Sequence, residues 1–273
     1  MDDAFLEDLV AKAAQHLCLL STETCDSDAI YGTLELIWDV SLSPSASETM
    51  ASIGCIEICW GIAFRSSDDR VQELCLGALA NMCLQSVCCG RLLHLPHAAV
   101  ACVSLCVPGA GMDVRSGSYV QALRLSRVIL CKCSTAQRPE LLQPLLRPNV
   151  CSQIVEAFPE GASPSDSELQ AALIDLQVYI MDGAAECCLS AQIADNFIVA
   201  GAFGTALQAA RGAASDIPQI ARFLSSCQNH AHALNLCDKC DAASIITSCV
   251  AMLAHPSLAS CGVAMVRCRN HVF

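Results

Sequence analysis

Five side chains in the C-terminal part of the chain have the types and spacing found in zinc sites: Cys227, His230, His232, Cys237 and Cys240. Thiolate sulfur and imidazole nitrogen are the usual ligands of a tetrahedral Zn²⁺ ion. However, the second cysteine pair follows the histidines closely, and a helix through this stretch would turn the two imidazoles away from each other. The Cys-x-x-Cys pair also lacks the βαβ pattern that surrounds redox motifs. A zinc- or thiol-responsive site is therefore the second hypothesis for function, and no metal is favoured.

The common catalytic motifs are missing from the sequence. It contains no Walker A loop, no Gly-x-Gly-x-x-Gly after a strand, no Gly-x-Ser-x-Gly and no His-Glu-x-x-His. The glycines of residues 109–111 lie in a loop and do not form a phosphate-binding turn. No spacing places a histidine and an orienting carboxylate beside one of the cysteines. We expect no catalytic residues, no enzyme activity and no cofactor.

The charge balance argues against a nucleic-acid partner. The chain has 27 acidic residues and 15 Lys and Arg, which gives a formal net charge of −12. A phosphate-binding groove needs a dense run of basic residues, and the sequence has none. An acidic surface instead favours basic protein partners.

The cysteine count is high, but its pattern is not that of a disulfide scaffold. The 21 cysteines are an odd number in a chain of 273 residues, and many are at helical spacing inside apolar runs. Cys55 and Cys59, like Cys102 and Cys106, are four residues apart. The first residues, Met-Asp-Asp, are acidic where a signal peptide would be basic. We expect reduced core thiols in an intracellular protein that is nuclear, cytoplasmic or both.

One stretch is long enough to cross a membrane. Residues 242–266 carry no charged side chain. They include His255-Pro256 and several Ser and Thr residues, which favour two short buried helices separated by a break. We therefore expect no membrane association.

The elements that must position any site are helices, and the stretch 69–83 is the clearest. It is apolar on most sides, so it must be packed between neighbours, and Asp68 or Asp69 can cap its start. Gly54 is the expected break within residues 48–64, and Asp166 or Ser167 the expected cap of a helix over 168–182. A further helix is expected over residues 185–197. The pattern is all-α.

Similar short sequence segments recur along the chain at the spacing of helical repeats. Aligning residues 37–41 with 79–83 superposes Asp39 on Asn81, 42 residues later. Aligning residues 125–129 next superposes Arg127 on Asn81, 46 residues later. Both steps fall within the armadillo and HEAT range of about 40–47 residues. We predict an armadillo/HEAT-like α-solenoid, a right-handed superhelix, as a single domain over residues 1–273. Its repeat cores are near 28–42, 69–83, 119–133 and 168–182, and its C-terminal helices cover 216–273.

The polar member of each repeat core suggests a binding surface. Asn81 occupies the position at which the inner helix of an armadillo repeat presents an amide to the backbone of a bound peptide. Asp39 and Arg127 match this position by register, and Trp38 beside Asp39 offers a stacking surface. The alternative is that these residues cap or bridge neighbouring helices and that Trp38 packs in the interior.

Three sequence segments are similar to those of a known family: Glu-Leu-Ile-Trp-Asp-Val-Ser at 35–41, Arg-Val-Gln-Glu-Leu-Cys-Leu-Gly-Ala-Leu-Ala-Asn-Met at 70–82, and Leu-Ser-Arg-Val-Ile-Leu-Cys at 125–131. They resemble the serum amyloid A-like (synoviocyte-proliferation-associated, SAAL-type) family over roughly residues 30–210. The resemblance implies an armadillo-type fold, a largely nuclear location, a link to cell proliferation and no catalytic residues. Taken with the repeats, it favours a non-catalytic scaffold that binds a protein or peptide along its concave face.

Overall fold

The computed structural model describes residues 3–19, 27–107, 113, 114, 116–158, 164–202 and 205. Within these ranges the regular structure is helical, without a β-strand, so the fold is an all-α solenoid as the sequence predicts. The chain divides into two compact units, residues 1–137 and 138–273, which are described one at a time. The prediction of one continuous domain over residues 1–273 remains a prediction.

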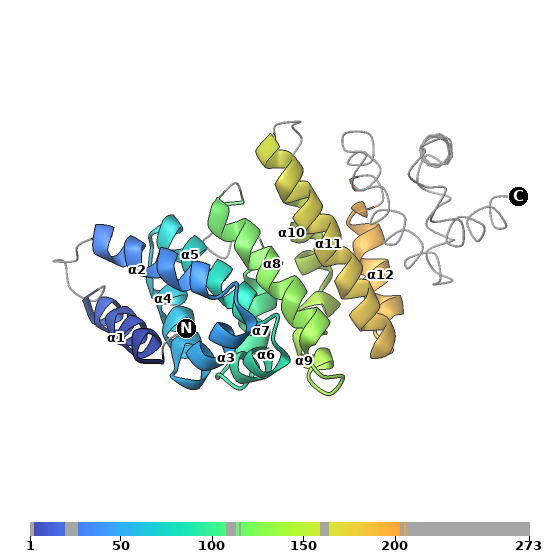
Figure 1. Ribbon diagram of the computed structural model, residues 1–273. Coiled ribbons are helices and arrows are strands. Elements are labelled where there is room, and N and C mark those ends of the chain that lie inside the picture. Colours follow the sequence, from blue (N-terminus) through green and yellow to red (C-terminus); the bar gives the residue numbers. More distant parts are fainter. Residues whose placement is uncertain are drawn as a thin grey trace, which may run out of the picture. The chain divides into compact units, whose positions relative to one another are not determined.

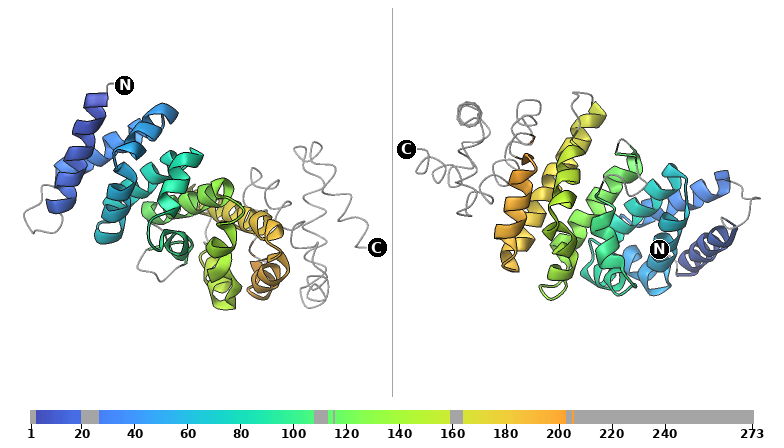
Figure 2. Two further views of the ribbon diagram at one scale, coloured as in Figure 1. Left: turned by 90° about the horizontal axis from the view of Figure 1, so that it is seen from below. Right: turned by 180° about the vertical axis from the view of Figure 1, so that it is seen from behind.

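Figure 1 shows the helices of the first unit in chain order. Helices α2, α5 and α8 form a row in which α5 packs against both of the others, while α4 packs on α5 and α1 packs on α2 and α4 (Figures 1 and 2). The bounds are α1 (Asp3–Leu19), α2 (Ser27–Val40), α3 (Pro44–Ser52), α4 (Cys55–Arg65), α5 (Asp69–Met82), α6 (Ser86–Leu93), α7 (Ala98–Ser104) and α8 (Gly117–Lys132).

Local sequence signals determine where several of these helices begin. The Asp68 carboxylate caps α5 by accepting hydrogen bonds from the backbone N–H groups of Arg70 and Val71, as predicted. Gly54 separates α3 from α4 with φ of 93°, a left-handed conformation that suits a glycine. Pro44 does more than end the preceding helix, since it occupies the first turn of α3, where its missing N–H costs no hydrogen bond.

Helix α5 is the buried centre of the first unit. Every residue from Leu74 to Met82 is buried, which confirms that an all-round apolar helix needs neighbours on most sides. Its exposed and half-exposed side chains are confined to the first turns, over residues 69–73. Any partner that reaches α5 from solvent therefore meets its N-terminal turns first.

The described residues of the second unit form α9 (Arg138–Leu142), the 3₁₀ turn η1 (Gln143–Leu146), α10 (Pro148–Glu156), α11 (Pro164–Glu186) and α12 (Ser190–Val199). Helix α11 begins at Pro164, so the prediction that Asp166 or Ser167 caps it is wrong, because both residues lie within its first turn and proline is itself a favoured first residue. The helix predicted over residues 185–197 is also wrong at its start. Helix α11 continues to Glu186, and Cys188, with φ of 58°, makes the left-handed turn before α12.

Candidate binding face

The N-terminal ends of the α2–α5–α8 row are joined by polar contacts at the surface. The Tyr31 hydroxyl of α2 donates a 2.6 Å hydrogen bond to Asp68 Oδ2 at the start of α5. This bond is the main reason that the pKa of the Asp68 carboxyl is lowered from its ordinary value. On the other side, the buried Ser118 hydroxyl of α8 donates to Asp69 Oδ1. The first turn of α5 is thus tied to both neighbouring helices.

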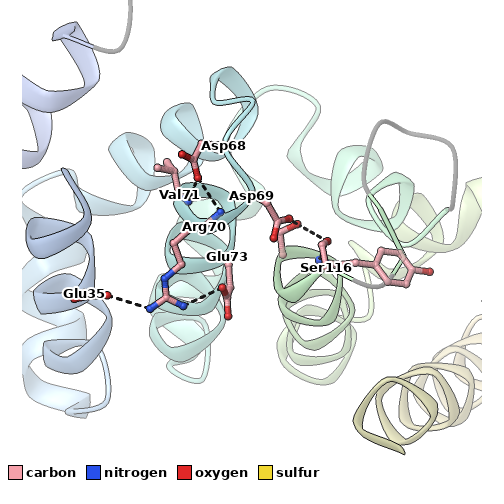
Figure 3. A network of polar contacts seen from close by, with 9 residues as sticks. Glu35, Asp68, Asp69, Arg70, Val71, Glu73 and Ser116 are labelled. Carbon is pink, nitrogen blue, oxygen red and sulfur yellow. Dashed lines mark hydrogen bonds and ion pairs between the residues drawn. The ribbon is translucent and has the colours of Figure 1, made fainter. Parts of the chain in front are cut away.

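Arg70 connects α2 and α5 through two ion pairs (Figure 3). Its Nη2 is 3.0 Å from Glu35 Oε1 on α2, and its Nη1 is 3.0 Å from Glu73 Oε2. The side chains of Arg70 and Glu35 are about half exposed, so water and salt screen the pair. Glu73 in turn lies against α8, because a side chain on Gly117 would be 2.6 Å from its Cδ.

The opposite end of the row is built around Asn81, which is 1% exposed. Its Nδ2 donates to Ser41 Oγ at 2.9 Å and to the Trp38 carbonyl oxygen at 3.5 Å. Its Oδ1 accepts a 2.6 Å hydrogen bond from Arg124 Nη2 on α8. Asn81 therefore bridges the C-terminal end of α2 to α8, which is the alternative that the sequence offered. A direct contact between its amide and a bound peptide remains a prediction.

Trp38 is half-buried and lies over the middle of α5. A Cβ at position 77 would overlap three atoms of the indole ring, so only glycine at this position leaves room for the ring. Of the two roles that the sequence allowed for Trp38, packing against a neighbouring helix is the one that its position in the structure matches. The indole covers the part of α5 that lies one helical turn before Asn81.

The other two predicted residues lie on the flanking helices. Asp39 is exposed on α2, four residues after Glu35 and therefore on the same helical face. Arg127 is half-exposed on α8, three residues after Arg124. The α8 residue whose side chain bonds to Asn81 is Arg124, not the Arg127 that the word alignment superposed on it.

Sequence reasoning did not single out Arg124, Ser41 or Gly77. One signal was available, since Trp38, Asn81 and Arg124 follow one another at steps of 43 residues. This step lies inside the repeat range of about 40–47 residues. A search for polar residues one repeat apart, instead of for similar words, would have found Arg124. Nothing local marks Ser41 as a partner.

Arg124 is held by neutral oxygens. Besides Asn81 Oδ1, it contacts Gln121 Oε1 at 3.4 Å, and among the described residues it makes no ion pair. Burial, and then repulsion from Arg127, lowers the pKa of the Arg124 guanidinium from its ordinary value. An arginine nonetheless stays protonated at neutral pH. The α8 side of the row therefore has a half-buried positive charge without a carboxylate to neutralise it.

The cysteines of the first unit are mostly core residues, as the sequence predicts. Of the nine cysteines over residues 55–132, eight are buried without a disulfide and Cys131 is exposed. The sulfur atoms of Cys55 and Cys59 are 3.8 Å apart without a disulfide. Burial raises the pKa of Cys106 to about 12, which leaves the thiol protonated and unreactive at neutral pH.

The predicted zinc ligands, Cys227 to Cys240, and the apolar stretch 242–266 lie outside the described residues. Within the described ranges no group of three or more His, Cys, Asp or Glu side chains is arranged to hold a metal ion. In the same ranges no single helix has the length and apolar character to cross a membrane. Two short helices that meet at a 99° bend, Ser86–Leu93 and Ala98–Ser104, pass that test only as a pair.

No known family model matches the sequence, and neither does any curated protein. The structure is similar to the crystal structures of two engineered proteins, both with a TM-score of 0.67, at 16% and 17% identity. Each match covers 94% of this chain, and 91% and 93% of the respective engineered protein. It is also similar to a designed armadillo repeat protein, with a TM-score of 0.64, 13% identity and coverage of 89% of this chain and 92% of the other. At such identities the likeness shows the fold alone, and that fold is armadillo-like.

Proposed function

We propose that this protein is a non-catalytic armadillo-like scaffold that binds a segment of a partner protein across helices α2, α5 and α8. The observation that carries the proposal is the row itself. Three helices are fixed side by side, and most of their exposed side chains are charged, although Ala29, Leu36 and Cys131 are exposed as well. A surface assembled before the ligand arrives spends little ordering entropy on binding.

The proposed contact residues lie on either side of α5. Asp39 on α2 and Arg127 on α8 reach solvent, and Trp38 adds a half-exposed indole between them and the core. The buried Asn81 amide supports this surface through its hydrogen bonds to the Trp38 carbonyl, Ser41 and Arg124. It contacts the ligand only if the ligand replaces one of these partners.

Membership of the serum amyloid A-like, SAAL-type family belongs to the same proposal. It is supported by the words at residues 35–41, 70–82 and 125–131, which fall on α2, α5 and α8, the three helices of the row. With it come a nuclear or cytoplasmic location and a role in cell proliferation as proposals. The absence of catalytic motifs from the sequence supports a binding role without an enzyme activity.

The test is affinity purification from cells with quantitative mass spectrometry. It compares the wild type with a double variant, Asp39→Lys with Arg127→Glu, which reverses one charge on each flanking helix. Arg91→Glu serves as the matched control, because Arg91 is a comparably exposed arginine on α6, outside the row. Circular dichroism confirms that each variant is folded.

Specific partners that disappear with the double variant and persist with Arg91→Glu support the scaffold. An unchanged partner list for the double variant contradicts it.

A further inference from the structure

The charges of the row are sorted by helix. Over its length α2 carries Asp28, Glu35 and Asp39 and no basic residue, whereas α8 carries Arg124, Arg127 and Lys132 and no acidic one. Helix α5, between them, has both signs in its exposed turns. The face therefore changes from negative to positive across a distance of three helices.

The charges on α2 and α8 belong to the same side of the row. Glu35 pairs with Arg70, and Arg70 pairs with Glu73 (Figure 3). Glu73 in turn lies against Gly117 of α8, so neighbouring groups connect α2 to α8. Arg124 is seven residues after Gly117, which places it on the same face of α8 two turns later. Asp39 has the equivalent relation to Glu35, one turn later on α2.

Helices α2 and α8 differ in the charge that their side chains leave without a partner of opposite sign. On α2, Asp39 is exposed, and Glu35 shares Arg70, its one basic partner among the described residues, with Glu73. Negative charge is therefore in excess on α2. On α8, the half-buried Arg124 contacts only amide oxygens among the described residues, and its fork of five N–H donors can still donate to a planar carboxylate. A ligand carboxylate bound to Arg124 would supply the negative charge that the described part of the chain does not place beside it.

We propose that the α2–α5–α8 face binds an extended peptide of mixed charge, with an acidic side chain on Arg124 and basic side chains beside Glu35 and Asp39. This inference rests on the proposed scaffold function and specifies its ligand. The net charge of −12 alone would favour a uniformly basic partner, and the separation of charge on this face is the reason to reject it.

The geometry also sets the spacing within the ligand. Packed helices are about 8–10 Å apart, so α2 and α8, with α5 between them, are about 20 Å apart. An extended peptide advances about 3.3 Å per residue. The acidic and basic groups of the ligand should thus be about five or six residues apart. Their order should be fixed, because an asymmetric face distinguishes the two directions of a peptide chain.

The test is selection from a displayed library of random twelve-residue peptides on the purified full chain. We expect enriched peptides to carry acidic and basic groups at that spacing and in a constant order.

One enriched peptide is then synthesised, labelled and titrated by fluorescence anisotropy. Arg124→Gln or Arg127→Gln should weaken its binding by about tenfold or more, and Arg91→Gln should leave it unchanged. Replacing the peptide's acidic residue by its amide should remove the effect of Arg124→Gln.

Because Arg124 also holds Asn81, thermal unfolding establishes that Arg124→Gln is folded, and Arg127→Gln provides a variant outside that hydrogen bond. Enriched peptides of a single charge sign, or equal affinity for the wild type and both arginine variants, would overturn the mixed-charge ligand while leaving a peptide-binding scaffold. A library that yields no enriched peptide would overturn the scaffold function itself.

Discussion

The two ends of the α2–α5–α8 row hold the same three helices together by different means. At the N-terminal end the contacts are charged and exposed, with Arg70 between two carboxylates. At the C-terminal end they are buried and mostly neutral, with Asn81 between Ser41 and Arg124 and an indole packed on Gly77.

Buried contacts and exposed ion pairs at the two ends of the row differ in what they contribute to stability and to binding. Exposed ion pairs contribute about 0–1 kcal/mol each, and a ligand can exchange them at little cost. A buried amide that loses its partners costs more, because water cannot replace them. The buried contacts of Asn81 are therefore suited to fixing the helices. The exposed charges, together with the N–H groups of Arg124 that do not contact Asn81, are suited to binding a partner.

The largest expected effect is on the buried core and comes from alkaline pH. Burial raises the pKa of Cys89 and Cys106 to about 12, whereas the ordinary value is 9.0. A thiol whose folded pKa is raised stabilises the fold fully below its unfolded pKa and loses that contribution as the pH rises above it. Each such thiol should lower the free energy of unfolding by about 1.4 kcal/mol between pH 7 and pH 10, so Cys89 and Cys106 together should lower it by about 3 kcal/mol.

Urea unfolding at pH 7 and pH 10 measures this loss. Cys106→Ala removes one buried thiol and should reduce the pH-dependent loss by about the amount for one group. Equal pH dependence in the wild type and the variant would contradict the assignment.

The next effect is expected at the centre of the buried end. Asn81→Ala removes hydrogen bonds to Ser41 and Arg124 and should lower the free energy of unfolding by about 2–3 kcal/mol. Asp39→Ala, on an exposed position of the neighbouring helix, should change it by no more than about 0.5 kcal/mol. Chemical denaturation of both variants provides the comparison, and equal effects would contradict the distinction between buried contacts and exposed charges.

Gly77→Ala tests the packing of Trp38. A glycine-to-alanine change inside a helix normally stabilises by about 0.5–1 kcal/mol, and Gly90→Ala on α6, where nothing lies within 4 Å of the added Cβ, should do so. At position 77 the Cβ overlaps the indole, and the expected result is a loss of about 1–3 kcal/mol with a shifted tryptophan emission. Stabilisation by both substitutions would show that the ring does not need this space.

Arg70→Ala should have a smaller effect. It removes two half-exposed ion pairs and should cost about 1 kcal/mol or less at low ionic strength, and less again at 1 M salt. Denaturation in both buffers measures the dependence. The effect of Asn81→Ala should not depend on salt, so a strong salt dependence in that variant would go against the contrast between the ends.

The smallest effect concerns Asp68. The hydrogen bond from Tyr31 lowers the pKa of this carboxyl below 3.8, so its contribution to stability is present above that pH and is lost as the pH falls through the folded value. Tyr31→Phe should therefore be slightly less stable than the wild type at neutral pH and indistinguishable from it at strongly acidic pH. A difference that persists in acid would point to packing of the ring instead.

Much of the fold follows from short-range features of the sequence. Asp68 caps α5, Gly54 separates α3 from α4, and the all-round apolar stretch of residues 74–82 is buried. These features act within one or two helical turns, so a pattern of types and spacing suffices to predict them. The start of α11 was predicted wrongly for a related reason, since Pro164 and Asp166 are both starting signals and spacing alone does not rank them.

The sequence by itself determined that Asn81 lies on a buried helix, at a position related by repeats to residues of the neighbouring helices. Only the tertiary structure decided that its amide meets Ser41 and Arg124 and that Trp38 lies over Gly77. These partners are about 40 residues away along the chain. Which of several polar side chains on a helix comes within 3 Å of a given atom depends on how that helix is rotated and shifted against its neighbour. Packing of the whole row sets that rotation, and no single segment contains it.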